Sequence, residues 1–309
     1  MGKGFLRNSN FEVVTMIVFG LSNSGSLAKG ISGKAKLKLG KYYCGKFPDG
    51  ELHIRFLEKV RGKEVLLAQS LSPEPNDSLM ELVFAARTAG ELGAKKVFAC
   101  IPYLAYARQD KRFHPGECFS AKEMASLLNY SIDGFITVDP HLHRIKNLKA
   151  IFKIKVIKLT SDSLIADYVK RHYSRNDTFL VGPDIESSQW AKKIADSIGF
   201  GSTIFLKERF SSRHVKIRVK KELDWKGKKV VIVDDIVSTG HTMIEAVKEI
   251  KKRKVRSVDL ICVHAIMAEG AYEKLRKAGA GKIISCNTVR HKSNGIDVSG
   301  MCAEAVMKL

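Results

Sequence analysis

The sequence lacks several features that would place it in a familiar class at once. It has no GxGxxG dinucleotide fingerprint, and the stretch closest to a Walker A loop, residues 40–47, lacks the Ser or Thr that would bind magnesium. Its six cysteines form no CxxC pair, and Cys100 and Cys262 lie in apolar runs, as buried thiols of a reducing cytosol do. The longest apolar run near the N-terminus, residues 13–21, is too short to span a membrane and lacks the flanks of a signal peptide. We therefore expect a cytoplasmic protein with no membrane partner.

Acidic residues are few beside the basic ones. The 309 residues include 53 Lys and Arg against 32 Asp and Glu, which gives a formal net charge of +21. Such an excess favours anionic partners, among them nucleotides, sugar phosphates and nucleic acid. No alternation of arginine with aromatic residues marks a nucleic-acid surface, and the basic run 251–254 suits the C-terminus of a helix. We therefore expect no nucleic-acid partner.

Strand and helix patterns alternate along the chain. Apolar runs such as 97–101 and 258–263 are typical of buried strands, and residues 79–92 carry helical periodicity. The alternation predicts an α/β fold with mainly parallel sheets and helices on both faces. The length and an apolar content of 45% predict two domains with substantial cores, which we place at residues 16–159 and 160–309.

The two ends of the chain carry separate expectations. Residues 1–15 are polar and unpatterned, which predicts a loose extension, and the choice between a real extension and a start at Met16 stays open. The tail 303–309 is predicted as a short helix that packs back on the N-terminal domain. The two halves look alike in organisation, although no close sequence repeat relates them.

Residues 229–242 contain the highest concentration of candidate functional side chains and read KVVIVDDIVSTGHT. Four β-branched residues, 230–233, predict a fully buried strand, and Asp234 and Asp235 follow at its carboxyl end. A short loop of Ser, Thr and Gly comes next, and a helix is predicted to open near Thr242 because apolar residues recur after it at helical spacing.

The loop and helix start of this segment predict an anion pocket. Backbone N–H groups converge there with the helix macrodipole, Ser238, Thr239 and Thr242 add hydroxyl donors, and Gly240 lets the backbone approach the anion closely. A phosphate would repel the two carboxylates, so they should face neutral hydroxyls such as those of a ribose. The pattern predicts a ribose 5-phosphate site, and its alternative is a buried strand that ends in an ordinary polar turn.

Three further strand ends carry polar side chains. Arg108, which can hold a phosphate through two hydrogen bonds, and Gln109 follow the strand 97–101, where ligands bind in open α/β sheets. The alternative for this stretch is a charged surface loop. His141 follows a strand in an Asp-x-His pattern, which alone is weak support for a metal because magnesium prefers oxygen ligands. Asp184 ends another strand.

Two stretches predict hairpins. Residues 47–51 read FPDGE, a turn signal before an alternating strand. The strand 204–209 ends in Lys207-Glu208-Arg209, and the basic stretch 210–221 after it predicts a mobile hairpin. On physical grounds alone both stretches are as well explained by surface hairpins and a solvated edge strand.

In this order the FPDGE, YARQD, Asp-x-His, KER and 229–242 motifs resemble those of the ribose-phosphate diphosphokinase (PRPP synthase) family, of the shorter type known among archaea. The resemblance extends over nearly the whole chain, from Met16 to Leu309. It implies two similar domains of the phosphoribosyltransferase type, an N-terminal one that binds ATP and forms oligomers and a C-terminal one that binds ribose 5-phosphate. The implied reaction moves the β,γ-diphosphoryl group of Mg-ATP to the anomeric hydroxyl of ribose 5-phosphate, giving PRPP and AMP.

The resemblance also implies a role for each motif. The loop at residues 47–51 reaches into a neighbouring subunit in that family, which implies a homo-oligomer of at least two chains. The implied ATP-binding residues are Phe47, Asp49, Gly50, Glu51, Arg108 and Gln109. The implied ribose 5-phosphate residues are Arg209, Asp234, Asp235, Ser238, Thr239, Gly240, His241 and Thr242. The resemblance assigns Mg²⁺ to His141 and Asp184, and catalytic charge neutralisation to Lys207 and Arg209.

Two departures from the family pattern and three alternatives remain. His241 replaces a glycine common in the phosphate loop, and residues 185–188 depart from a small, glycine-containing loop, which bears on the diphosphate contacts. A phosphoribosyltransferase would share the 229–242 segment but needs no ATP-gripping loop. A non-catalytic regulatory homologue would have lost catalytic side chains, and a nucleic-acid binder is favoured only by net charge.

Overall fold

The computed structural model describes residues 15–141, 145, 147–209, 215–219 and 224–309. The predicted extension, apart from its last residue, lies outside these ranges. So does most of the stretch predicted as a mobile hairpin. None of the helices in the described part of the chain combines the length and apolar character that crossing a bilayer requires.

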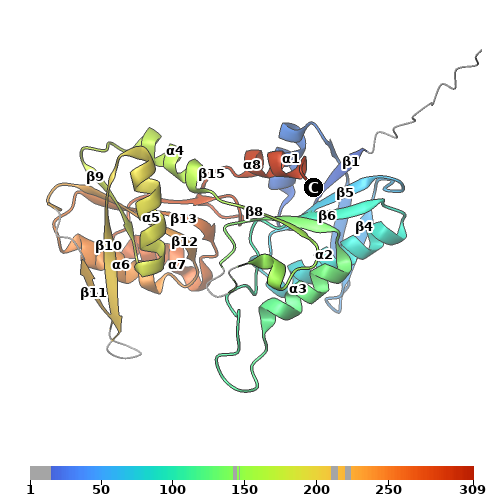
Figure 1. Ribbon diagram of the computed structural model, residues 1–309, viewed down its shortest axis with the longest axis horizontal. Helices are drawn as coiled ribbons and strands as arrows, with labels where there is room; N and C mark the ends of the chain where they lie inside the picture. The colour runs from blue at the N-terminus through green and yellow to red at the C-terminus, as the bar shows by residue number, and fades with distance from the viewer. Residues whose placement is uncertain (1–14, 142–144, 146, 210–214, 220–223) are drawn as a thin grey trace, which may run out of the picture.

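A six-stranded parallel sheet forms the N-terminal half (Figure 1). Its spatial order is β2-β1-β5-β6-β7-β8, with every neighbouring pair parallel. The strands are β1 (Met16–Gly20), β2 (Lys38–Leu39), β5 (Glu64–Ala68), β6 (Lys96–Cys100), β7 (Gly134–Val138) and β8 (Lys155–Leu159), and the helices are α1 (Gly25–Ala35), α2 (Pro75–Glu91) and α3 (Ser120–Ser131). A separate antiparallel hairpin joins β3 (Tyr42–Lys46) to β4 (Leu52–Phe56).

A seven-stranded sheet forms the C-terminal half, in the order β11-β10-β9-β12-β13-β14-β15. Only the β10–β11 pair in this described sheet is antiparallel. The strands are β9 (Thr178–Gly182), β10 (Gly201–Arg209), β11 (Val215–Val219), β12 (Lys229–Val237), β13 (Ser257–Ala265), β14 (Ile283–Cys286) and β15 (Asn294–Ile296), and the helices are α4 (Asp162–His172), α5 (Ile185–Ile198), α6 (His241–Lys251), α7 (Ala271–Lys277) and α8 (Ser299–Val306). The predicted fold, parallel sheets flanked by helices, is confirmed.

The alternation of buried side chains along each strand assigns helices to opposite faces of the sheets. Leu66 of β5 packs on the face covered by α1 and α8, whereas Leu67 packs on the face covered by α2 and α3. In the second sheet, Val231 packs beneath α4 and α5 while Ile232 packs beneath α6 and α7. Both sheets are therefore sandwiched between helices, as parallel sheets require.

One apolar cluster joins the two halves. It contains Val18 and Ile136 of the first sheet, Val231 of the second, and Cys302 of α8, all of them fully buried. The last helix, α8, lies beside α1 (Figure 1), so closely that a Cβ on Gly30 would come within 2.7 Å of the Ser299 hydroxyl. The C-terminal helix thus packs on the N-terminal half. Its start is four residues earlier than the sequence pattern indicated. The division at residue 160 stays a prediction.

Asp297 fixes the start of α8 to α1. Its carboxylate accepts hydrogen bonds from Lys34 Nζ at 2.7 Å and from the N–H and hydroxyl of Ser299 at 2.9 and 2.7 Å, and Asn287 adds a fourth at 2.8 Å. Burial opposes the charge, but these bonds outweigh it and lower the pKa of Asp297 below its ordinary value. The network therefore favours the ionised form.

We predict that Asp297→Asn lowers the melting temperature at neutral pH by about 2–4 °C, as a loss of about 1 kcal/mol does in a domain of 150–250 residues. Because the folded-state pKa lies below the unfolded value of about 3.9, this contribution is present above about pH 4 and is lost as the pH falls further. Thermal unfolding at several pH values measures it. Asp196→Asn, which breaks only the exposed Lys192–Asp196 pair, is the control and should change little. A deficit that persists unchanged at pH 3 would contradict the assignment.

Candidate active site

Strand β12 carries the paired carboxylates. Residues 230–233 are fully buried, as predicted, but the strand continues to Val237, so Asp234 and Asp235 lie within it rather than after it. The strand continues because its two neighbouring strands pair with it over different lengths. β13 pairs with β12 as far as Val237, whereas pairing with β9 stops at Ile232. The strand is therefore supported on one side and open on the other where the carboxylates begin.

The loop after β12 leads directly into α6. The helix starts at His241, one residue before the predicted position, with Gly240 at its N-cap in a left-handed conformation, φ +75°. No side chain caps this helix. Among the described residues, no group accepts a hydrogen bond from the N–H of Thr239, Gly240 or His241. The unsatisfied donors and the positive end of the helix dipole are what a phosphate binds.

Asp184 reaches the same region from the end of β9. It is the N-cap of α5, and its carboxylate accepts from the Ser187 N–H at 2.9 Å while the Ser187 hydroxyl accepts from the Asp184 N–H at 3.1 Å. A Cβ on Gly182 would lie 2.3 Å from the Ser188 nitrogen, so α5 packs directly on the strand end. Residues 185–188, which depart from the small, glycine-containing loop of the family pattern, form the first turn of this helix.

The N-terminal half contributes two side chains. Arg108 is exposed in the loop after β6, and His141 follows β7 with its Nδ1 2.5 Å from Asp235 Oδ2. A pocket of about 200 Å³ brings these elements together, lined by Arg108, His141, Asp184 and residues 234–243. It therefore combines three of the predicted motifs and the end of β9.

Negative charge accumulates on one side of this pocket. Burial, followed by the nearby carboxylates of Asp235 and Asp184, raises the pKa of Asp234 well above its ordinary value. Arg108 is the cation that lines the pocket together with them. A ligand that brings positive charge or hydroxyl donors to these carboxylates would stabilise their ionised form.

The donor set suits magnesium held jointly with a substrate. In the described ranges no three His, Cys, Asp or Glu side chains are arranged to hold a metal by themselves. Mg²⁺ is commonly bound by one or two carboxylates together with water and substrate phosphates, which is what Asp184 beside an anion pocket offers. His141 is paired with Asp235 through Nδ1, so any metal contact would have to use its other ring nitrogen.

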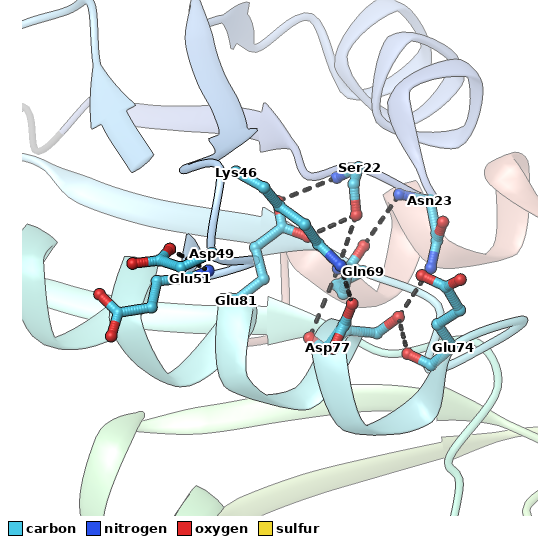
Figure 2. Close-up of polar contacts among 10 residues, drawn as sticks. Ser22, Asn23, Lys46, Asp49, Glu51, Gln69, Glu74, Asp77 and Glu81 are labelled. Atoms are coloured by element: carbon cyan, nitrogen blue, oxygen red, sulfur yellow. Dashed lines mark hydrogen bonds and ion pairs between the residues drawn. The ribbon is translucent and has the colours of Figure 1, made fainter. Parts of the chain in front are cut away.

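Other predicted site residues lie away from this pocket. The Gln109 amide points to Glu117 Oε2, 3.4 Å away. The tip of the β3–β4 hairpin is exposed: Phe47 stacks on His53, with ring centroids 4.9 Å apart, and Asp49 accepts from the Glu51 N–H. Figure 2 shows how an ion pair between Lys46 and Asp77 holds this hairpin on α2.

The predicted catalytic cations lie at the end of β10, which pairs with β11 in an antiparallel hairpin. Lys207 is opposite Ile217, and Arg209 is opposite Val215. An antiparallel hairpin is therefore present, formed by β10 with β11. Of the segment 210–221 that was predicted to be mobile, residues 210–214, 220 and 221 lie outside the described residues.

At the carboxyl end of β1 in the N-terminal sheet, the described backbone donors are bonded within the protein (Figure 2). Glu81 of α2, 2% exposed, accepts from the N–H and the hydroxyl of Ser22 and from Gln69 Nε2 at 2.7 Å. The Asn23 N–H donates to Gln69 Oε1. Because the protein's own side chains accept these hydrogen bonds, the backbone donors that could hold an anion are already used.

The fold and the pocket define a class, the proteins built on the phosphoribosyltransferase domain. Residues 147–299 match the phosphoribosyl transferase domain, and residues 16–131 match the N-terminal domain of ribose phosphate pyrophosphokinase. The chain is 35% identical over 293 residues to the ribose-phosphate pyrophosphokinase of Methanothermobacter thermautotrophicus, an alignment that covers 94% of this chain and 100% of the relative. It is 32% identical over 294 residues to that of Methanopyrus kandleri, with 95% and 99% covered.

The three-dimensional comparison agrees. The crystal structure of phosphoribosylpyrophosphate synthetase from Mycobacterium smegmatis superposes with a TM-score of 0.80 at 26% identity, covering 95% of this chain and 98% of that one. This chain therefore belongs to the ribose-phosphate pyrophosphokinase family.

We predict that Gly240→Ala weakens phosphate binding because the new Cβ would lie 3.2 Å from Ala271 Cβ and displace the loop donors. Gly199→Ala is a matched control, since Gly199 also has a positive φ, +71°, but open space around it. Both variants should lose about 1–2 kcal/mol of stability to the left-handed conformation. Only Gly240→Ala should lose affinity for ribose 5-phosphate in calorimetric titration, and equal affinity in both variants would contradict the loop assignment.

Proposed function

We propose that the protein is a ribose-phosphate diphosphokinase that transfers the β,γ-diphosphoryl group of Mg-ATP to the anomeric hydroxyl of ribose 5-phosphate, giving PRPP and AMP. The pocket that joins Arg108 and His141 to the Asp234–Thr242 segment carries this proposal. Such a transfer between polyanions depends on positioning and charge neutralisation more than on covalent help from the protein.

The C-terminal half would hold the acceptor. The free N–H groups at residues 239–241 and the hydroxyls of Ser238, Thr239 and Thr242 suit the 5-phosphate. His241 serves through its backbone N–H, so its replacement of a glycine removes no donor. The carboxylates of Asp234 and Asp235 suit the ribose hydroxyls, because an ionised carboxylate accepts strong hydrogen bonds.

The N-terminal half would hold the donor. Arg108 lines the same pocket, and its guanidinium can bind a phosphate of ATP in a bidentate manner. Magnesium, bound by Asp184 and phosphate oxygens with His141 nearby, would neutralise charge on the transferred group. Lys207 and Arg209 would add positive charge from the end of β10 as the transition state forms.

The hairpin residues would serve a second copy of the chain. Phe47, Asp49, Gly50 and Glu51 lie at an exposed tip, and none of them lines the pocket described here. Phe47 offers a ring for an adenine to stack on, and the two carboxylates can accept hydrogen bonds from its amino group. With Gln109, they would complete an ATP site between subunits, so the active protein would be at least a dimer.

Incubation with ribose 5-phosphate and Mg-ATP tests the proposal, with AMP resolved from ADP. We expect AMP and PRPP in equal amounts. Formation of ADP would indicate an ordinary kinase. Consumption of PRPP with a nucleobase, without AMP formation from ATP, would indicate a phosphoribosyltransferase.

We predict that Asp234→Asn loses ribose 5-phosphate binding selectively. Hydrogen bonds to a charged group contribute about 1.5–3 kcal/mol, so the affinity should fall roughly 10- to 150-fold while the affinity for Mg-ATP is kept. The melting temperature should not fall, because the substitution removes one of three mutually repelling carboxylates. Calorimetry and thermal unfolding measure both effects. A loss of ATP affinity with unchanged ribose 5-phosphate affinity would refute the assignment of the acids.

A further inference from the structure

His264 is a buried histidine that does not line the pocket. It occupies the next-to-last position of β13, opposite Ile236 of β12, and is 1% exposed. In the sequence, His264 is a single histidine within the apolar run 260–266, and this pattern does not indicate a functional role. Its surroundings in the structure are polar on two sides.

The ring of His264 connects the two sheets. Its Nε2 is 3.1 Å from the carbonyl oxygen of Asp139, which follows β7 of the N-terminal sheet. Its Nδ1 is 2.9 Å from the hydroxyl of Thr288, whose carbonyl accepts from Ser70 after β5 at 2.7 Å. The ring also packs against Tyr103, with centroids 5.1 Å apart. A side chain of the second sheet thus touches the loop of Asp139 and the loop of Tyr103, which contribute His141 and Arg108 to the pocket, and also the loop that holds Thr288.

The hydrogen-bond partners determine where the proton lies on this ring. A carbonyl only accepts, so Nε2 must carry the proton that is donated to Asp139. Nδ1 is then left as an acceptor beside the Thr288 hydroxyl, whose single proton lies between this nitrogen at 2.9 Å and the Val263 carbonyl at 2.7 Å. Burial lowers the pKa of His264, which favours this neutral form.

The backbone and the side chain of Asp139 are both held by hydrogen bonds. Its N–H donates to the Leu159 carbonyl at 2.9 Å, and its carboxylate accepts from the N–H and hydroxyl of Ser161 at 2.8 and 2.6 Å. Its backbone has a positive φ of 37°, which is uncommon for a residue other than glycine. The bond from His264 connects the C-terminal sheet to this segment as well. Two residues further on, His141 meets Asp235 at 2.5 Å.

We propose that His264 is a positioning residue that sets the placement of the 139–141 segment over the Asp234–Asp235 pair. β12 and β13 are adjacent strands, and each contacts the segment at one residue. Asp235 of β12 contacts His141, and His264 of β13 contacts Asp139. The two contacts fix the donor side of the pocket relative to the acceptor side. This inference rests on the proposed function, since it concerns how the two substrates are aligned.

The first test observes the hydrogen bond without any turnover. Nitrogen NMR of the imidazoles, with His264 assigned by comparison with His264→Gln, reports which nitrogen carries the proton. We expect a neutral ring protonated at Nε2. A neutral ring protonated at Nδ1 could not donate to Asp139 and would overturn the proposal, whether or not the chain makes PRPP.

The second test uses two variants that both remove the ring. In His264→Gln the amide lies where Nε2 was and can still donate to Asp139, whereas in His264→Asn it lies nearer the Nδ1 position and cannot. We expect kcat for PRPP formation to fall about 10- to 100-fold in the Asn variant and to stay within about threefold in the Gln variant, since misplacement by 1 Å costs up to about 10²-fold. KM for ribose 5-phosphate should change little in either, because the phosphate loop lies outside the segment.

The pair distinguishes positioning from simple packing. Both variants should show similar melting temperatures, so a purely structural role predicts equal losses of kcat, and that result would overturn the proposal. A wild-type chain that makes no PRPP in the same assay would instead refute the proposed function. The NMR result would still decide whether the His264–Asp139 bond exists.

Discussion

The shared apolar cluster between the two sheets is the constraint on which the site depends. Fully buried residues such as Val18, Ile136 and Val231 come from both sheets, and α8 completes the cluster by packing on α1. Interiors of this kind are close-packed and deform little. The carboxyl ends of the two sheets are therefore held at a fixed separation, and bonds such as His141–Asp235 can form between them.

The two sheets have similar topology, but in the described residues the backbone N–H groups at their carboxyl ends have different partners. After β1, the N–H groups of Ser22 and Asn23 donate to the side chains of Glu81 and Gln69. The first turn of α2 also contains Asp77, whose charge would repel a phosphate. After β12, by contrast, the loop donors have no protein acceptor in the described chain and α6 has no cap. Similar topology thus supports a ligand site in one half and a structural bridge in the other.

Residue type and spacing predicted the strand and the helix that form the site. The buried strand at 230–233, the helix that opens near Thr242 and the alternation of strand and helix all follow from residue type and spacing, and the structure confirms them. The extension of β12 through Asp234 and Asp235 was not predictable, because it depends on pairing with β13. The first turn of α5 at residues 185–188 was missed since its capping box pairs Asp184 with a serine rather than with the Glu or Gln of the usual pattern.

Contacts between segments that are distant in the chain could not be predicted from the sequence either. Nothing in a single sequence pairs His141 with Asp235 or His264 with Asp139, because these residues are far apart in the chain and on different sheets. The resemblance to a family supplied candidate residues, but not which of them meet in one chain. The structure brings Arg108 and His141 to the acceptor pocket, whereas the tip of the hairpin at 47–51 lies elsewhere.

The crowding of carboxylates at the pocket shows how function can oppose stability. The pKa of Asp234 is raised by burial and by Asp235 and Asp184, so its ionised form is disfavoured in the free protein. The Asp184 carboxylate accepts a hydrogen bond from the Ser187 N–H, and His141 is bound to Asp235. Among the described residues, no cation forms an ion pair with Asp234. Ribose hydroxyls and a magnesium ion would supply the missing donors and charge. Binding free energy that relieves repulsion already present in the free protein would favour the complex in which both substrates are aligned.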